Sequence, residues 1–226
     1  MATISENLQA VRARIDRACG ASQKVTLLAV CKGHNVARVR EAVAAGQRAF
    51  GENYVQEALE KMRELPTLEW HLIGPLQSNK TRLAAERFQW VQTLQSEKIA
   101  RRLSEQRPAT LEPLNVLIQV NISRENTKSG VALEEVRALA EAVARLPRLR
   151  LRGLMAMPES TRDVGLQRAR FRAAREKFDE LAAEFGFDTL SMGMSDDMEA
   201  AIAEGATLVR IGTAIFGARN KEKSAA

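Results

Sequence analysis

Cysteine and histidine are scarce in this chain. Its 226 residues include two cysteines, Cys19 and Cys31, and two histidines, His34 and His71, and no CxxC pair occurs. Structural zinc sites are built from clusters of these residue types, so no metal site is expected. The cysteine usage is typical of a reducing compartment, and we expect both thiols to serve as packing groups.

Long hydrophobic runs are also missing. The N-terminal segment MATISENLQAVRARI lacks the apolar core of a signal peptide. No apolar stretch reaches the roughly 20 residues that span a bilayer. The sequence therefore predicts a cytoplasmic protein without membrane contact.

Aromatic residues make up only 4% of the chain, while its formal net charge is +6 and arginine is in large excess over lysine. A basic balance can indicate nucleic-acid binding, but such sites interleave basic residues with stacking aromatics, and no stretch here does so. The densest basic segment, RARFRAAREKF at 168–178, has the helical spacing of a solvated amphipathic face. No nucleic-acid partner is expected.

What the sequence does contain is an alternation of strand-like and helix-like runs, which follows an opening amphipathic helix over about residues 4–19. The candidate strands are 25–32, 48–53, 68–74, 90–94, 114–122, 149–157, 188–195 and 208–217. Short apolar runs that alternate with helices predict parallel βαβ units, and eight of them predict a single (β/α)8 TIM barrel domain over residues 1–226 with an extra N-terminal helix. A doubly wound sheet is the alternative, but CKGHNVAR lacks the glycine-rich fingerprint of that fold.

A lysine ends the first predicted strand, in the run LLAVCK. The active sites of such barrels lie at the carboxyl ends of the strands, and Lys32 alone among nine lysines closes an apolar strand at that end. A lysine that is partly removed from water has its charged form disfavoured, so its amine is available to form a Schiff base with a carbonyl. An ordinary ion pair across the barrel mouth is the alternative.

Ser195, Gly212 and Thr213 follow the last two predicted strands, where such barrels often bind phosphate. Ser195 lies where a strand turns into a helix and suits either a helix N-cap or an oxyanion ligand. Gly212 would let a ligand approach the backbone beside the Thr213 hydroxyl, although a barrel bend and a plain strand residue are the alternatives. With a Schiff-base lysine, these donors predict a site for a phosphorylated aldehyde, of which pyridoxal 5′-phosphate (PLP) fits best.

Seven segments of the chain resemble the pyridoxal phosphate homeostasis protein family. They are LLAVCK, AFGENYVQEAL, WHLIGPLQSNK, VNISRENTKSG, RGLMAM, LSMGMSDDMEAAI and VRIGTAIFGAR, and they extend from about residue 25 to 219. This family is similar to the N-terminal barrel of alanine racemases, which is the barrel of PLP fold type III. The resemblance implies that Lys32 carries PLP as a Schiff base and that Ser195, Gly212 and Thr213 hold its phosphate.

The resemblance also implies roles for residues around the cofactor ring. Asn53, Met155 and Arg210 would line the pocket, and Lys128 matches a second lysine that the family places near the site entrance. An arginine beside the pyridine nitrogen would keep that nitrogen unprotonated and weaken the ring as an electron sink. Because strand alternation does not decide which way Arg210 faces, a surface or ion-pair role is the alternative.

One position departs from the family pattern. Family members commonly follow the Schiff-base lysine with a hydroxyl residue and another lysine, whereas this chain reads Lys32-Gly33-His34. His34 therefore takes the place of a second basic residue, where it either titrates near neutral pH or is simply solvated.

The resemblance implies a cofactor carrier or buffer in intracellular PLP homeostasis, with apo PLP-dependent enzymes as possible partners and no robust turnover. A racemase-like enzyme acting on amino acids is the alternative. Racemases of this fold add a tyrosine base from a separate C-terminal β-domain, and here the sequence stops shortly after the last strand. The single tyrosine, Tyr54, is a weak replacement, and the missing dimer contact of that domain favours a monomer.

Overall fold

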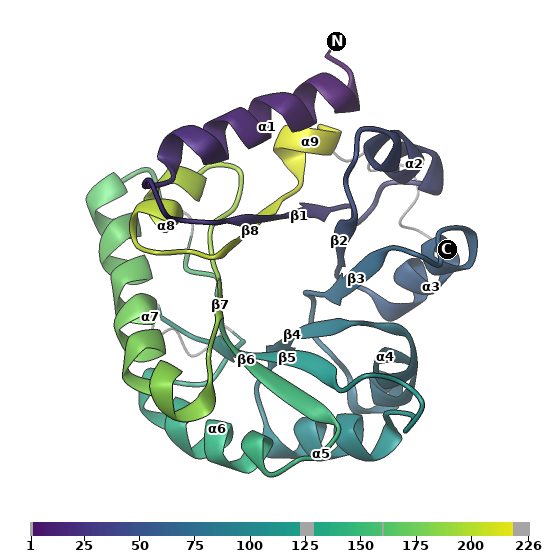
Figure 1. The fold of residues 1–226 in the computed structure, drawn as a ribbon, viewed down its shortest axis with the longest axis vertical. Helices are drawn as coiled ribbons and strands as arrows, with labels where there is room; N and C mark the ends of the chain where they lie inside the picture. Colours follow the sequence, from purple (N-terminus) through teal and green to yellow (C-terminus); the bar gives the residue numbers. More distant parts are fainter. Residues whose placement is uncertain (1, 123–128, 160, 219–226) are drawn as a thin grey trace.

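The computed structural model describes residues 2–122, 129–159 and 161–218, in which eight parallel strands close into a barrel in chain order (Figure 1). The strands are Thr26–Val30 (β1), Ala49–Glu52 (β2), Glu69–Leu72 (β3), Trp90–Leu94 (β4), Leu114–Val120 (β5), Leu149–Ala156 (β6), Thr189–Ser191 (β7) and Leu208–Ile211 (β8). Pairing of β1 with β8, in the register Ala29 to Ile211, closes the ring. The predicted (β/α)8 barrel is confirmed.

Helices surround the ring of strands (Figure 1). They are α1 (Ile4–Ala18), α2 (Val36–Ala44), α3 (Val55–Glu64), α4 (Thr81–Arg87), α5 (Glu97–Gln106), α6 (Val136–Ala144), α7 (Val164–Phe185), α8 (Met198–Ala203) and α9 (Thr213–Phe216), with 3₁₀ turns η1 (Ser78–Lys80) and η2 (Leu133–Glu135). Several begin at side-chain caps: the Asn35 side chain accepts from the Arg38 N–H at α2, and Asp163 accepts from the Leu166 N–H at α7. Among the described residues, no helix combines the length and apolarity needed to cross a bilayer.

The extra N-terminal helix lies across the outside of the barrel beside α9, next to the β1–β8 seam (Figure 1). Its buried stripe consists of Ile4, Leu8, Val11 and Ile15, and a capping box of Thr3 and Glu6 starts it. Two polar side chains tie it to the barrel mouth. The Asn7 Nδ2 donates to the Ile215 carbonyl at 2.9 Å, and the Arg14 Nη2 donates to the Ser195 carbonyl at 3.2 Å.

The last predicted strand, 208–217, is longer than the strand in the structure. The structure ends β8 at Ile211 and starts a helix at Thr213, so the alternative of Thr213 as a plain strand residue is wrong. Strand pairing explains this, because the register between β1 and β8 runs out at Ile211 and the next residues fold onto α1. Local apolar character alone cannot separate TAIF as a strand from TAIF as a buried helical turn.

Candidate functional site

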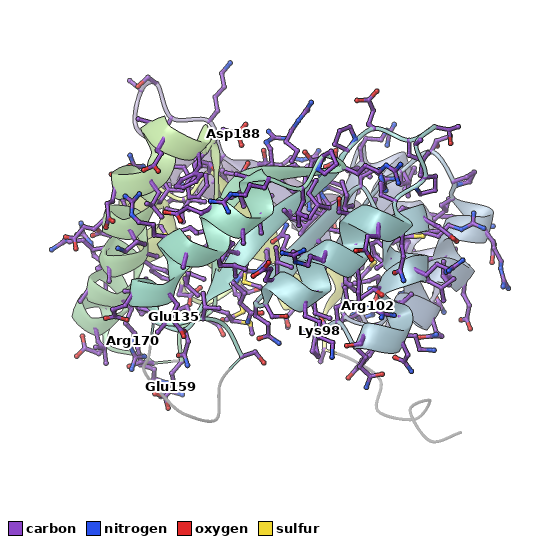
Figure 2. The ribbon with its side chains drawn as sticks, turned by 90° about the horizontal axis from the view of Figure 1, so that it is seen from below. Lys98, Arg102, Glu135, Glu159, Arg170 and Asp188 are labelled. Atoms are coloured by element: carbon purple, nitrogen blue, oxygen red, sulfur yellow. The ribbon has the colours of Figure 1, made fainter. Side chains whose placement is uncertain are left out.

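A cavity of about 680 Å³ opens at the carboxyl ends of the strands. This size is within the usual range for small-molecule sites. Glu159, which lines the cavity, and Asp188, which directly precedes β7, mark opposite ends of the barrel in Figure 2. Of the residues predicted from the sequence, the cavity brings together Lys32, Asn53, Ser195, Arg210, Gly212 and Thr213.

Met155, which was also predicted for the pocket, is not among the residues that line this cavity. Met155 is buried and packs with Trp90 and Leu117. It lies two residues before Met157, which does line the cavity, and alternate strand residues share a face. Met155 is therefore one layer deeper in the barrel interior. Lys128 lies outside the described residues.

The backbone on both sides of Lys32 is held by charged side chains of α3. The Lys61 Nζ donates to the Cys31 carbonyl at 2.8 Å, and the Gly33 N–H donates to the Glu57 Oε1 at 2.6 Å. Lys61 also pairs with Glu57 at 2.8 Å. The peptide groups that flank Lys32 are thus fixed by one ion pair, while Lys32 itself is half-buried at the cavity wall.

Behind Lys32 lies a buried cluster that the sequence reasoning missed. The Glu52 Oε1 accepts from the Lys61 Nζ at 2.5 Å and from the Cys31 thiol at 3.0 Å, and all three side chains are buried. Burial raises the pKa of Glu52 to about 7, and the other oxygen, Oε2, has no hydrogen-bond partner in the structure. Burial works against the charge on Lys61, but its acidic neighbours, the Cys31 thiol and Glu52 first among them, leave the Lys61 pKa raised. Lys61 is therefore the cation of this cluster at neutral pH.

Arg210 lies in the barrel interior and lines the cavity. Its Nη1 donates to the Ser191 Oγ at 2.7 Å and its Nη2 donates to the Ala156 carbonyl at 2.9 Å. Burial lowers its pKa to about 10, so the guanidinium stays charged at neutral pH, and the nearby Asp197 favours that charge. Arg210 is 4% exposed, which excludes the surface role that the sequence had left open.

Ser195, Gly212 and Thr213 come together where the loop after β7 meets the start of α9. The Ser195 Oγ accepts the Ala214 N–H at 3.3 Å, which joins the two segments. The N-cap of α8 is Asp197, so Ser195 does not have the capping role that was its alternative. A Cβ on Gly212 would come within 3.2 Å of the Val30 carbonyl oxygen, so glycine permits the close approach of β8 to β1 here.

Two further residues of the mouth have distinct surroundings. The ring of His34 lines the cavity and stacks on Phe216 with centroids 5.1 Å apart, so it is more than a solvated loop histidine. Tyr54 is 63% exposed and is not among the cavity-lining residues. Within the described residues, no group of three or more histidine, cysteine, aspartate or glutamate side chains is arranged to hold a metal ion.

Comparison with known proteins gives one consistent group. The family profile described as "Alanine racemase, N-terminal domain" matches residues 2–220. The chain is 60% identical to a "Pyridoxal phosphate homeostasis protein" of Pseudomonas aeruginosa over 97% of both chains, and 55% identical to one of Escherichia coli (strain K12) over 99% of this chain and 100% of the other. The solved structure of PipY of Synechococcus elongatus with PLP bound is similar, with a TM-score of 0.84 and 38% identity over 95% of this chain and 100% of that one.

Proposed function

The chain belongs to the pyridoxal phosphate homeostasis protein family, whose barrel is that of the alanine racemase N-terminal domain, and on this basis we propose that it binds PLP and manages the availability of this cofactor in the cell. The family expected from the sequence motifs is confirmed. A similar protein, PipY, has been solved with PLP bound, which supports the same cofactor here. The partners that we propose for it are apo PLP-dependent enzymes.

The residues of the cavity fit PLP. The observation that carries the proposal is that Lys32 and the group formed by Ser195, Gly212 and Thr213 line one cavity, on the neighbouring strands β1 and β8 and the loop after β7. Lys32 would hold the aldehyde carbon as a Schiff base, and the hydroxyl and backbone groups near the start of α9 would hold the phosphate. The charged guanidinium of Arg210 suits an anionic ligand.

The ring of PLP would lie between these two ends, with Asn53 beside it and Arg210 toward the pyridine nitrogen. Arg210 stays charged and is already held by two acceptors, so it would donate to that nitrogen without giving up a proton. When bound, PLP supplies an aldehyde carbon that another primary amine can take over from Lys32. The half-buried position of Lys32 at the barrel mouth leaves room for such an exchange.

We propose further that the protein has no robust turnover of its own. Racemization of an amino acid needs a second base opposite the lysine, and the one tyrosine of the chain is Tyr54, which is 63% exposed outside the cavity. Losing one placed general base typically removes about 10²- to 10⁴-fold in rate. Arg210 donates to the ring nitrogen without releasing its proton, which weakens the ring as an electron sink and lowers the rate of racemization further.

The experiment that separates carrier from enzyme uses the PLP-loaded protein. Incubation with L-alanine should yield no D-alanine above a trace, while mixing with an apo PLP-dependent enzyme should restore that enzyme's activity at a rate above that with an equal concentration of free PLP. Racemization at the rate of a dedicated racemase would overturn the carrier proposal. Reactivation no faster than with free PLP would show that the protein stores the cofactor without delivering it.

The phosphate assignment leads to a quantitative expectation. Because one hydrogen bond to a charged group contributes about 1.5 to 3 kcal/mol, Ser195→Ala should weaken PLP binding roughly tenfold or more, and Thr213→Val should do the same. Ser104→Ala is the matched control, because Ser104 is buried, is not among the residues that line the cavity, and accepts the Arg148 N–H. Titration with PLP measures the three affinities. Wild-type affinity in both Ser195→Ala and Thr213→Val would place the phosphate elsewhere.

A further inference from the structure

A chain of polar side chains crosses the barrel interior from the cavity to the opposite end of the barrel. It starts at Arg210, whose Nη1 donates to the Ser191 Oγ at 2.7 Å. The Ser191 hydroxyl donates to the Gln92 Oε1 at 2.7 Å, and the Gln92 Nε2 meets the His71 Nδ1 at 2.8 Å. The last link joins the His71 Nε2 to the Glu69 Oε1 at 2.8 Å. Five side chains from β3, β4, β7 and β8 thus form one continuous series.

The two ends of the chain determine the direction of every hydrogen bond in it. A guanidinium only donates, and an ionised carboxylate only accepts. Glu69 therefore requires a proton on the His71 Nε2, which leaves the Nδ1 of a neutral ring as an acceptor. Gln92 must then present its amide NH₂ to His71 and its Oε1 to Ser191. The Ser191 proton points to Gln92, and its oxygen is left to accept from Arg210.

The protonation states of the histidine and the carboxylate agree with this direction. Burial lowers the pKa of His71, which keeps the ring neutral near pH 7, and the hydrogen bond from His71 lowers the pKa of Glu69, which keeps the carboxylate ionised. The Arg152 guanidinium, which lies 4.8 Å from the centroid of Trp90, also favours the charge on Glu69.

Stacking and burial fix the members of the chain in place. The His71 ring is stacked on Trp90 with centroids 5.1 Å apart and an interplanar angle of 7°. Ser191 and Gln92 are fully buried, His71 is 1% exposed, and the Glu69 side chain reaches solvent with 47% exposure. Arg152 pairs with Asp188, which marks the end of the barrel away from the cavity in Figure 2.

Such a series needs an explanation beyond stability. The interiors of these barrels are commonly filled by branched aliphatic residues, and a buried polar group is tolerated only when it is hydrogen-bonded. Replacing both partners of a buried hydrogen bond by apolar groups of the same shape is often neutral or stabilising. What the polar series adds is a single fixed orientation for the Arg210 guanidinium, which donates to two directed acceptors in the cavity wall.

We propose that Ser191, Gln92 and His71 are positioning residues for Arg210, and that through them the ligand cavity is coupled to Glu69 at the opposite end of the barrel. The chain holds the guanidinium so that it faces the ligand ring in one orientation. For the identity of that ligand the inference rests on the proposed function, with PLP bound beside Arg210. The hydrogen-bonded series of side chains is present in the protein without ligand, and it can be tested in that form.

The first test uses the ligand-free protein with ¹⁵N-labelled histidine. The protein has only two histidines, so the His71 ring signals can be distinguished from those of His34. We expect the tautomer with the proton on Nε2, and we expect Ser191→Ala and Gln92→Met each to shift the His71 Nδ1 resonance, with Ser191 acting on His71 through Gln92. A proton on Nδ1, or a His71 spectrum that Ser191→Ala leaves unchanged, would overturn the proposal.

The second test compares two buried glutamines in PLP titrations. Gln92→Met interrupts the hydrogen-bonded series. Gln47→Met removes a glutamine that is also buried but lies outside the series, where it donates to two backbone carbonyls at 2.8 and 2.9 Å. Removal of one buried link should weaken PLP binding about tenfold, the equivalent of 1.4 kcal/mol, and move the visible absorbance band in Gln92→Met alone. Equal affinities and spectra in the two variants would refute the coupling.

The outcomes keep this inference apart from the proposed function. A wild-type protein that takes up no PLP refutes the function, and the histidine spectra of the ligand-free protein still decide whether the chain exists as described. If the wild-type protein binds PLP but Gln92→Met behaves like Gln47→Met, the proposed function is retained and the positioning role is refuted.

Discussion

Lys32→Ala is expected to abolish covalent attachment of PLP while the protein remains folded. Lys32 is the lysine of the cavity wall, and the flanking peptide groups are held by Lys61 and Glu57, so loss of its side chain leaves the backbone contacts intact. The wild-type protein with PLP should show visible absorbance from the Schiff base, and borohydride reduction followed by peptide mapping should place the label on Lys32. In Lys32→Ala both signals should disappear.

Lys24→Ala is the control for this experiment. Lys24 is exposed and precedes β1 at the end of the barrel away from the cavity, so its removal should change neither the absorbance nor the labelled peptide. A Lys32→Ala protein that retains the visible band, or a reduced wild-type protein labelled at another lysine, would contradict the assignment. Circular dichroism of both variants checks that the fold is retained.

Lys61→Met is expected to be the most destabilising of the substitutions considered, by about 3 to 5 kcal/mol above neutral pH, because it leaves buried Glu52 without its cation. Lys61 is 4% exposed and bonds Glu52, Glu57 and the Cys31 carbonyl at 2.5 to 2.8 Å. Urea unfolding at several pH values measures the effect. Because Lys61 also holds the peptide before Lys32, we expect weaker PLP binding as well.

The sign of the pH dependence follows from the Glu52 carboxyl. Its folded pKa of about 7 lies above the ordinary value of 4.5, so the folded state keeps a proton that the unfolded state releases, and this group lowers the free energy of unfolding as pH rises from 4.5 to 7. Without Lys61 the folded pKa rises further, so the decline continues above pH 7. The cost of Lys61→Met should therefore be larger at pH 8.5 than at pH 6, where Glu52 is neutral in both proteins.

Two variants give this prediction its controls. Lys177→Met removes a lysine of α7 whose Nζ also lies 2.5 Å from a carboxylate, that of Glu180, but whose ion pair lies at the surface. This variant should lower the free energy of unfolding by less than about 1 kcal/mol. The double variant Lys61→Met/Glu52→Gln removes the carboxyl as well as its cation, and should regain the pH-dependent part of the loss. A Lys61→Met variant whose loss is the same at pH 6 and pH 8.5 would show that Glu52 does not carry the charge.

The part of the site that could be read from the sequence lies at strand ends. Lys32, Asn53 and Ser195 each follow a predicted strand or end it, and the parallel order of the strands brings all such ends to one face. For that reason a local pattern was enough to place these residues at one cavity. The family motifs then gave each of them a chemical role, which remains a proposal for this chain.

The residues that the sequence reasoning missed lie inside strands or on helices. Gln92 and Ser191 stand in WVQTL and DTLSMGMS, and a polar residue inside such a run was the available signal. His71 and Lys61 gave less warning, because an amphipathic helix carries many lysines and a strand of alternating character can expose a histidine. Only the packing of α3 against β2 shows that Lys61 points inward to Glu52.

By itself, the amino-acid sequence determined the number and order of the strands and the presence of a lysine at the barrel mouth, because apolar periodicity and strand ends are local properties. The tertiary structure alone decided that Arg210 faces the cavity, that Met155 lies one layer below it and that Thr213 begins a helix. It also joined Arg210 to Glu69 through three buried side chains. These facts depend on strand register and barrel closure, which place residues far apart in the chain within hydrogen-bond distance of one another.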